Sequence, residues 1–268
     1  MTPPQKDGYL LELSDEFDGA ELDLGKWLPA YLPQWTTRER AAARYRLDGS
    51  HLYLQIAADQ EPWCPAYDGE IRVSSLQTGV YAGPVGSRIG QHRFHPDITV
   101  VDAQTAARLY TPQYGYFELR ARAVADRDCM VALWMIGYED APERSGEILI
   151  LEIFGEDVEA GAARVGMGVR RFADPDLVGD FEKVPLDVDV TAFHVYAAEW
   201  TPTHVDFFVD GRRVKSVGES PAYPMQFMLD IYQFAGAERE ARPPGAYPVE
   251  FAVDYFRAYQ PVGGYPAR

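Results

Sequence analysis

Two glutamates interrupt an otherwise apolar segment between Gly146 and Gly155, and they restrict how this segment can fold. The six other residues between the two glycines are Ile, Leu or Phe, a composition typical of a buried strand. Glu147 and Glu152 are five positions apart, so a regular strand would place them on opposite faces of its sheet. A helix would also separate them, because five residues rotate by well over one turn. Since burying an unpartnered carboxylate is costly, both charges require a specific reason.

A β-bulge between the two glutamates would remove the conflict, because it absorbs one residue without a change of face. Glu147, Leu149 and Glu152 would then share a face, with the two glutamate Cα atoms separated by four pleats, roughly 13 Å. On a concave sheet, long side chains can lean together across part of that distance. Retaining glycosidases use two carboxyls about 5–5.5 Å apart. The alternative is that each glutamate faces solvent or pairs with an arginine, and the spacing alone leaves both open.

Short strand-like segments separated by turn residues make up most of the chain. Residues 114–123 alternate apolar and charged side chains, and residues 129–137 are continuously apolar, as in a strand buried on both faces or lining a groove. Asp210 and Gly211 form the two-residue signal of a type I′ hairpin. Helical periodicity is nearly absent, apart from a turn expected around residues 37–43. The pattern predicts an all-β sandwich or jelly roll in one domain.

The charge balance narrows the range of partners. A net charge of −16 argues against nucleic acid and against anionic membranes, since both bind clustered Lys and Arg. No run of 18 apolar residues is present to predict a membrane span. The first residues lack the apolar core of a signal peptide, so we expect a cytoplasmic protein, or a secreted one if an export signal was removed. We expect a monomer.

Segments along the whole chain resemble one known family. The segment GEILILEIFG resembles the active-site strand of glycoside hydrolase family 16, whose usual bulged pattern is Glu-x-Asp-x-x-Glu. Further landmarks follow the family's order over residues 14–260: SDEFDGAELDLGKW, YGYFELRARA with ALWM, FHVYAAEWTPTHVDFFVDG and VDYFRAYQ. The resemblance implies a concanavalin A-like β-jelly-roll sandwich of two curved antiparallel sheets, with a substrate cleft across the concave face. One such domain would cover residues 1–268, with its core at about 8–260.

The resemblance also implies roles for the two glutamates. Glu147 matches the family's nucleophile and Glu152 its general acid/base. The implied activity is that of a retaining, endo-acting hydrolase of β-glucan or a related β-linked polysaccharide, which needs no cofactor for catalysis. Two alternatives remain open on the same fold: a non-catalytic carbohydrate-binding protein, and a transglycosylase.

Other positions depart from the family pattern or match it only locally. Leu149 replaces the middle Asp, and a leucine offers no hydrogen bond and dries its surroundings, which tends to raise a neighbouring carboxyl pKa. Trp134 matches a cleft aromatic that could stack on a sugar, or it could be a core residue. Trp35 matches a tryptophan of a cleft-edge loop, and Glu39 lies near a common polar sugar contact. Residues 164–171 contain no histidine, although the family often has one facing the acid/base.

Metal sites are a further possibility. Many family members hold a structural Ca²⁺ with backbone oxygens and one late Asp. The resemblance matches Asp254 to that Asp and places Glu16 and Gly49 near the backbone positions. Ca²⁺ takes six to eight oxygen ligands, of which these residues supply only part. His92 and His95 could also bind a metal, but a loop packed over the cleft is the simpler interpretation because no third ligand has suitable spacing.

Overall fold

Strands form where the sequence alternates or is continuously apolar, as a computed structural model of residues 5–265 shows. The segment around residues 114–123 forms β7 (Gly115–Arg122), and the continuously apolar segment forms β8 (Cys129–Gly137). The predicted hairpin joins β14 (Val205–Val209) to β15 (Arg212–Val217). Asp210 and Gly211 at its tip have φ angles of 50° and 75°, as a type I′ turn requires.

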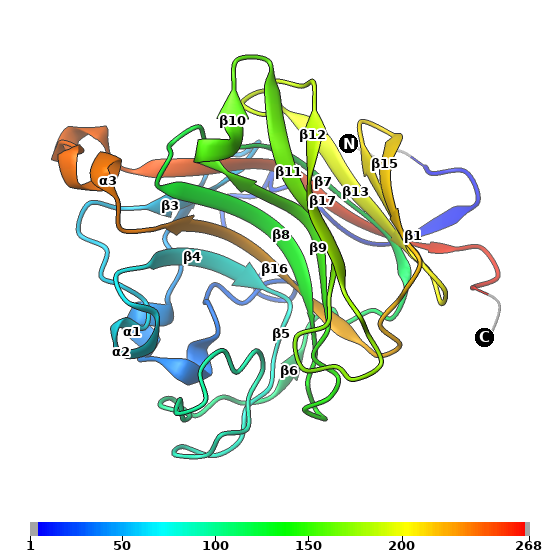
Figure 1. Ribbon diagram of the computed structural model, residues 1–268, viewed down its shortest axis with the longest axis horizontal. Helices are drawn as coiled ribbons and strands as arrows, with labels where there is room; N and C mark the ends of the chain where they lie inside the picture. The colour runs from blue at the N-terminus through cyan, green and yellow to red at the C-terminus, as the bar shows by residue number, and fades with distance from the viewer. Residues whose placement is uncertain (1–4, 266–268) are drawn as a thin grey trace.

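Two curved antiparallel sheets face each other (Figure 1). Within residues 5–265, the first sheet contains, in spatial order, β15, β14, β13 (His194–Trp200), β7, β17 (Val249–Pro261), β3 (Leu52–Ile56) and β2 (Tyr45–Leu47), with β1 (Tyr9–Asp15) paired to β17. The second contains β10 (Val158–Glu159), β11 (Ala162–Arg170), β9 (Glu147–Phe154), β8, β16 (Met225–Gln233) and β4 (Arg72–Gln77), with β12 (Asp180–Leu186) paired to β11. The predicted all-β sandwich is confirmed.

The remaining elements are short and lie in the connections. They are the ribbon of β5 (Gly79–Val80) and β6 (Ala107–Arg108), and the helical turns η1 (Pro33–Trp35), α1 (Arg38–Ala41), α2 (Pro65–Asp68), η2 (Gly155–Asp157), α3 (Ala237–Ala241) and η3 (Pro244–Ala246). The turn expected around residues 37–43 is the single helical turn α1, where the Thr37 side chain accepts a hydrogen bond from the backbone N–H of Arg40. In the described part of the chain, no helix has the length and apolarity needed to cross a membrane.

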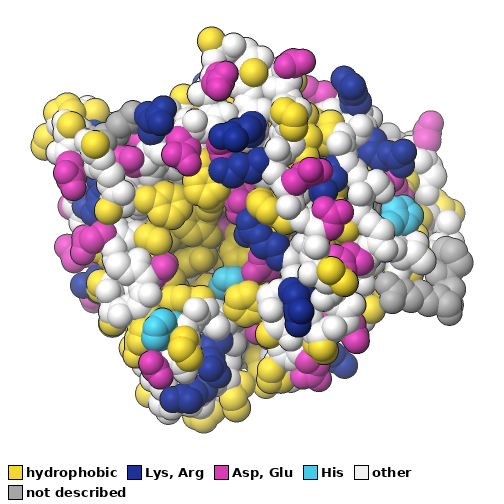
Figure 2. All heavy atoms as spheres, viewed as in Figure 1, with side chains coloured by type: hydrophobic (Ala, Val, Ile, Leu, Met, Phe, Trp, Pro, Cys, Tyr) yellow, Lys and Arg dark blue, Asp and Glu magenta, His cyan; other side chains and the backbone are white. Residues whose placement is uncertain are grey.

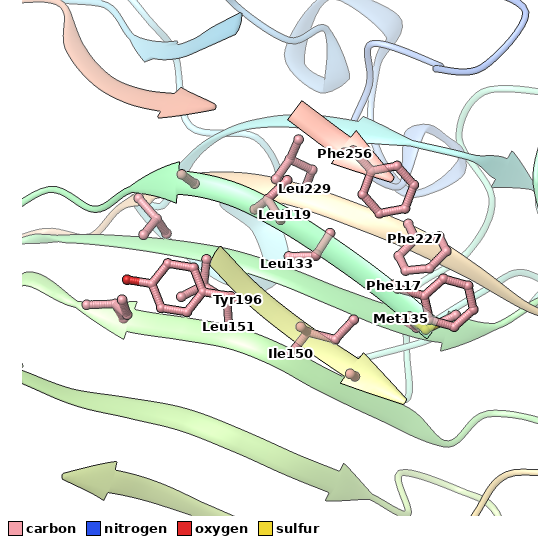
Figure 3. Packing of buried hydrophobic residues seen from close by; sticks show 14 of the residues in the cluster. Phe117, Leu119, Leu133, Met135, Ile150, Leu151, Tyr196, Phe227, Leu229 and Phe256 are labelled. Atoms are coloured by element: carbon pink, nitrogen blue, oxygen red, sulfur yellow. The ribbon is translucent and has the colours of Figure 1, made fainter. Parts of the chain in front are cut away.

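The main hydrophobic core lies between the two sheets (Figure 3). Each strand contributes every second side chain, because residues of a strand alternate between faces. Burial of each large apolar side chain contributes roughly 1.5–3 kcal/mol to folding. Residues of the first sheet meet those of the second in this layer: Phe117, Leu119, Tyr196 and Phe256 on one side, and Leu133, Met135, Ile150, Leu151, Phe227 and Leu229 on the other.

Strand β9 contains the bulge that the two glutamates predict. Leu133 of β8 pairs with Leu151, whereas the next residue of β8, Trp134, pairs with Leu149. Ile150 is therefore the extra residue of β9. Two consecutive residues, Ile150 and Leu151, are both buried in the core between the sheets. The alternation resumes one residue out of phase, and this shift returns the following residue to the outer face of the sheet.

Glycines of β11 face the bulge from the other side. Gly166 pairs with Glu152 and Gly168 pairs with Leu149, so two residues of β11 span three of β9. Gly168 has a φ of 145°, a conformation that L side chains rarely adopt. A Cβ atom there would lie 2.1 Å from the backbone oxygen of Asp180 in β12. Only glycine fits at this position of β11, which pairs with β9 on one side and β12 on the other.

We expect Gly168→Ala to lower the free energy of unfolding by about 3 kcal/mol, because the methyl group meets backbone atoms and the φ angle is strained. Gly218→Ala is the matched control: a Cβ at Gly218 meets no atom within 4 Å, so its effect should stay within about 0.5 kcal/mol. Urea unfolding of both variants measures the difference. Equal losses in the two variants would contradict the role of Gly168.

Candidate active site

A cavity of about 320 Å³ lies over β8, β9, β11 and β16, on the face of the second sheet that points away from the core. Figure 2 shows this hollow, floored by hydrophobic side chains and edged on one side by acidic and basic ones. Aromatic and aliphatic walls with a few polar groups are the usual composition of a ligand pocket. The lining consists of Tyr31, Asp68, Ile71, His92, Met130, Ala132, Trp134, Glu147, Leu149, Glu152, Phe154, Arg170, Tyr232 and Phe234.

The two glutamates lie together in this cavity. Glu147, Leu149 and Glu152 all line it, so the predicted shared face is confirmed. Glu147 is 4% exposed and Glu152 is 8% exposed. Leu149 lies between them and packs with Trp134, its neighbour across the strand pair, in a second hydrophobic cluster under the cavity. The leucine therefore supplies an apolar floor between two buried carboxyls.

Arg170, on β11 opposite Glu147, contacts both carboxyls. Its Nη2 donates to Oε1 of Glu152 at 3.2 Å and its Nη1 donates to Oε2 of the same residue at 3.5 Å. The same Nη1 lies 3.8 Å from Oε2 of Glu147. The two Oε2 atoms can be no further apart than the sum of these two Nη1 distances. That bound on one pair of oxygens is compatible with the roughly 5–5.5 Å carboxyl separation of retaining glycosidases.

Burial sets the electrostatics of the pair. It raises the pKa of Glu147 to about 7; the Arg170 guanidinium opposes this shift and the Glu152 carboxylate adds to it. Burial also raises the pKa of Glu152, again opposed by Arg170. Arg170 itself stacks its guanidinium 3.8 Å above the ring of Phe181, which holds it in place beside the two acids. One cation thus serves two carboxyls that burial tends to keep protonated.

Trp134 forms part of the cavity wall, and Asp230 of β16 holds it there. Asp230 is fully buried and accepts hydrogen bonds from the indole N–H of Trp134 and, at 3.1 Å, from the hydroxyl of Tyr232. Burial raises the pKa of Asp230 to about 7, and these hydrogen bonds oppose the shift. Tyr232 meets Tyr31 edge-on, with ring centroids 5.5 Å apart. Asp230 therefore fixes two aromatic walls without itself lining the cavity.

His92 comes from the long connection between β5 and β6 and also lines the cavity. The expected packing of this loop over the site is confirmed for His92. The Nδ1 of His92 lies 3.4 Å from Oε1 of Glu147. Burial, followed by the charge of Arg170, lowers the pKa of His92 to about 4. His95, in contrast, packs against Tyr67, with ring centroids 4.8 Å apart.

Two residues expected at the cleft lie elsewhere. Trp35 is 1% exposed and does not line the cavity, because the loop carrying Gly90 covers its ring. Its indole N–H donates to the backbone oxygen of Gln91 at 2.8 Å, so Trp35 supports the loop from beneath. Glu39 is exposed on α1 and is not part of the cavity lining. Trp35 is therefore covered by the connection between β5 and β6, and Glu39 faces solvent outside the cavity.

Of the residues matched to a calcium site, Asp254 is already paired with a cationic side chain. The Asp254 carboxylate is paired with Arg120, and the Glu16 carboxylate is held by Arg257 through Nε at 2.9 Å and Nη2 at 2.7 Å. Gly49 is exposed in a turn with a φ of 83°. The Arg120 guanidinium thus occupies the carboxylate of Asp254, the one side chain that the resemblance offers to Ca²⁺, whereas Glu16 and Gly49 were matched only through backbone oxygens. Among residues 5–265, no group of three or more His, Cys, Asp or Glu side chains is arranged to hold a metal ion.

Sequence reasoning did not identify several groups that line or support the site. Arg170 appears in the sequence only as one arginine of a strand that lacks a histidine, and its role depends on the β9–β11 register. Asp230 is an acidic residue in an apolar segment, MQFMLDIYQ, and this was a signal of the same kind as the two glutamates. Tyr31, Asp68 and Tyr232 come from segments that only the fold brings to the cavity.

Together, the fold and the cavity define a concanavalin A-like β-sandwich with a buried carboxyl pair in an aromatic-walled site. The sequence matches the family described as glycosyl hydrolases family 16 over residues 103–253, more than half of the chain. The chain belongs to this family, and the resemblance seen in the sequence is confirmed.

The relatives include proteins named as glucanases and one named as a galactosidase. A β-glucanase from Rhodothermus marinus is 31% identical over 188 residues, covering 58% of this chain and 62% of that protein. The solved structure of a GlcNAcα1-4Gal releasing endo-β-galactosidase from Clostridium perfringens has a TM-score of 0.81 and 33% identity, covering 99% of this chain and 65% of that one. A laminarinase from Flavobacterium sp. UMI-01 has a TM-score of 0.62 at 21% identity, covering 94% of this chain and 100% of that one, and supports the fold alone. The chain thus spans less than two thirds of each of the first two relatives.

We expect Arg170→Leu to raise the pKa of both glutamates further, by about one unit, because their shared cation is lost. Carboxyl ¹³C NMR titration of the protein labelled at glutamate measures this directly. Arg213→Leu is the control, because it removes a cation that pairs with Asp206 on the other sheet. It should leave the pKa values of Glu147 and Glu152 unchanged. An unchanged pKa of Glu152 in Arg170→Leu would show that the ion pair between Arg170 and Glu152 does not form in solution.

Proposed function

We propose that the protein is a retaining, endo-acting glycoside hydrolase of a β-linked polysaccharide, with Glu147 as nucleophile and Glu152 as general acid/base. The observation that carries this proposal is the bulge of β9, which brings two otherwise divergent glutamates into one aromatic-walled cavity. A structural strand has no need of two buried carboxyls on one face, since each costs free energy. Membership of glycosyl hydrolases family 16 supports the same function.

In the first step, the Glu147 carboxylate attacks the anomeric carbon and the glycosidic C–O bond breaks. Glu152 gives its proton to the departing oxygen, so the leaving sugar departs as a neutral alcohol and Glu152 becomes a carboxylate. Arg170, already beside both acids, stabilises the negative charge as it moves from Glu147 to Glu152. The product of this step is a glycosyl ester of Glu147.

In the second step, the Glu152 carboxylate takes a proton from water as the water oxygen attacks the anomeric carbon. The ester bond breaks, Glu147 leaves as a carboxylate and Glu152 is protonated again. Two inversions give net retention of configuration. A sugar hydroxyl in place of water would give transglycosylation through the same ester.

The cavity supports sugar binding through its walls. Trp134, Tyr31 and Tyr232 present aromatic surface, which packs against the apolar faces of pyranose rings. The hydrogen bonds of Asp230 fix the orientations of Trp134 and Tyr232 before a ligand binds. Such preorganisation lowers the entropic cost of binding.

Two substrate classes follow from the relatives. β-Glucan is the class named by the relatives called β-glucanase. A second candidate is a glycan with an internal β-galactosidic linkage, and one specific observation favours it: the C. perfringens endo-β-galactosidase matches 99% of this chain at 33% identity. The β-glucanase match, in contrast, covers 58% of the chain. A substrate panel must therefore contain both linkages.

We expect the protein to release oligosaccharides from one member of a panel of β-glucans, β-galactans and glycans ending in GlcNAcα1-4Gal, with retained anomeric configuration by ¹H NMR. Glu152→Gln should lower the rate about 100- to 10,000-fold, but much less for an aryl glycoside whose leaving group needs no proton. Glu147→Gln should abolish turnover of both substrates. Azide should rescue Glu147→Gly with an α-glycosyl azide and Glu152→Gly with a β-glycosyl azide, because each opens the opposite face of the sugar.

The control is Glu159→Gln, which changes an exposed glutamate of β10 and should not alter the rate. Binding without cleavage across the whole panel would support a non-catalytic carbohydrate-binding protein instead. Inverted product configuration would exclude Glu147 as the nucleophile. Transfer to added sugar acceptors in preference to water would identify a transglycosylase.

The dependence of kcat/KM on pH should show a rising limb with a midpoint near 7. Glu147 must be ionised to attack, and burial raises its pKa to about 7, so the protonated and inactive form predominates below that pH. Glu152 must be protonated to act as an acid, so activity falls as it loses its proton. Because its pKa is also raised, this descending limb of the profile lies above the ordinary pKa range of glutamate. Circular dichroism over the same pH range separates titration from unfolding. A rising limb near pH 4.5 would contradict the effect of burial on Glu147.

A further inference from the structure

The imidazole of His92 lies beside the carboxyl of Glu147. Its Nδ1 is a buried atom that lacks a hydrogen-bond partner among residues 5–265, and it lies 3.4 Å from Oε1 of Glu147. Arg170 approaches the other oxygen, Oε2, of the same carboxyl. Leu149, the residue of β9 nearest to Glu147 on this face, offers no hydrogen bond. The 3.4 Å separation is at the long end for a hydrogen bond, and such bonds in active sites often tighten only when substrate binds.

The position of His92 is strongly constrained by its neighbours. Its ring stacks on Phe172, with centroids 4.6 Å apart and planes at 20°, and meets Trp134 edge-on at 5.2 Å. The backbone of His92 has a φ of 50°, in the left-handed region that costs a non-glycine residue free energy. Its backbone N–H donates to Oε1 of Glu139 at 2.7 Å, which secures this conformation. Packing, strain and a buried acceptor together hold one imidazole beside one carboxyl.

The protonation state of the imidazole suits a hydrogen-bond donor. Burial and the neighbouring Arg170 lower the pKa of His92 to about 4, so the ring is neutral near pH 7 and carries one N–H. A neutral imidazole with its proton on Nδ1 can donate to the Glu147 carboxylate without adding a charge. A hydrogen bond to the ionised form of an acid favours that form.

We propose that His92 is a positioning residue that donates a hydrogen bond from Nδ1–H to Oε1 of Glu147, so that His92 and Arg170 hold the two oxygens of the nucleophile. This inference rests on the proposed role of Glu147. The hydrogen bond orients the other lone pairs of the carboxylate toward the anomeric carbon and favours its ionised form. It takes the place of the hydrogen bond that Leu149 cannot provide.

Other charged or titratable groups also act on Glu147 and must remain unchanged in a test. They come from each element around it: Arg170 of β11, Glu152 of β9, Glu139 after β8, and Tyr31 before η1. Burial raises the pKa of Glu139 to about 8, with the His92 N–H opposing this shift and Glu147 adding to it. Variants of His92 alter none of these side chains, so a change in Glu147 titration can be assigned to the imidazole.

The first test measures the tautomer of His92 by ¹⁵N NMR of the imidazole nitrogens in the full chain, with the signals assigned by their loss in His92→Phe. The proposal predicts a neutral ring with the proton on Nδ1 at pH 7.5. A ring protonated on Nε2 would overturn it, because Nδ1 could then only accept. This readout requires no substrate, so it decides the inference even if the protein proves not to be a glycosidase.

The second test compares two variants in the activity assay. His92→Phe keeps an aromatic ring between Phe172 and Trp134 but removes the donor; we expect kcat to fall about tenfold to hundredfold, with little change in KM. The rising limb of its kcat/KM profile should move up by about one pH unit. In His92→Asn, the amide nitrogen occupies the place of Nδ1 and asparagine tolerates the positive φ angle, so most of kcat and the position of the limb should be restored.

A merely structural role of His92 predicts a different result. His92→Asn, which loses the stacked ring, would then be as impaired as His92→Phe or more so, and the limb would not move. His95→Phe in the same loop is the control and should match the wild type in both measurements. If the wild type cleaves its substrate but neither limb nor kcat responds to His92→Phe, the inference fails while the proposed function stands. If no panel member is cleaved, the proposed function fails and the tautomer measurement alone applies.

Discussion

The bulge in β9 is the constraint on which the site depends. Because Ile150 and Leu151 both enter the core, the five-residue step from Glu147 to Glu152 spans four pleats and ends on the same face. A strand without this bulge would bury one of the two glutamates in the hydrophobic layer between the sheets. Gly168 of β11 pairs with Leu149 beside the bulge and has a backbone conformation that L side chains rarely adopt.

A second consequence of the bulge is electrostatic. In a protein with a net charge of −16, two of the carboxyls are concentrated in a cavity with apolar walls, and burial raises the pKa of both. Arg170 is the cation that offsets this cost, because its guanidinium nitrogens reach both acids and its guanidinium stacks on Phe181. Burial and a shared cation therefore act in opposite directions on both carboxyls, and the pKa of each lies above the ordinary value for glutamate.

Much of the fold could be predicted from local patterns. Strict alternation identified β7, continuous apolarity identified β8, and the Asp210–Gly211 pair identified the β14–β15 hairpin, because each depends on residues adjacent in sequence. The bulge was also predictable, since two charges at an odd spacing in an apolar strand allow few other solutions. Expectations that depended on loops were less successful. Trp35 is near the cavity but lies beneath the β5–β6 connection, and its burial depends on how that connection packs on its ring.

The sequence by itself determined the class of fold, the bulged strand with its two glutamates and the membership of a family, because strand periodicity and motif spacing are properties of neighbouring residues. Only the tertiary structure decided which groups accompany the glutamates. Arg170 reaches them through the register of β11, and His92 reaches Glu147 from a connection more than fifty residues earlier in the chain. Asp254 could be matched to a calcium site by position, but the structure pairs its carboxylate with Arg120. Contacts between distant segments, and the burial that sets each pKa, arise only when the sheets and loops pack together.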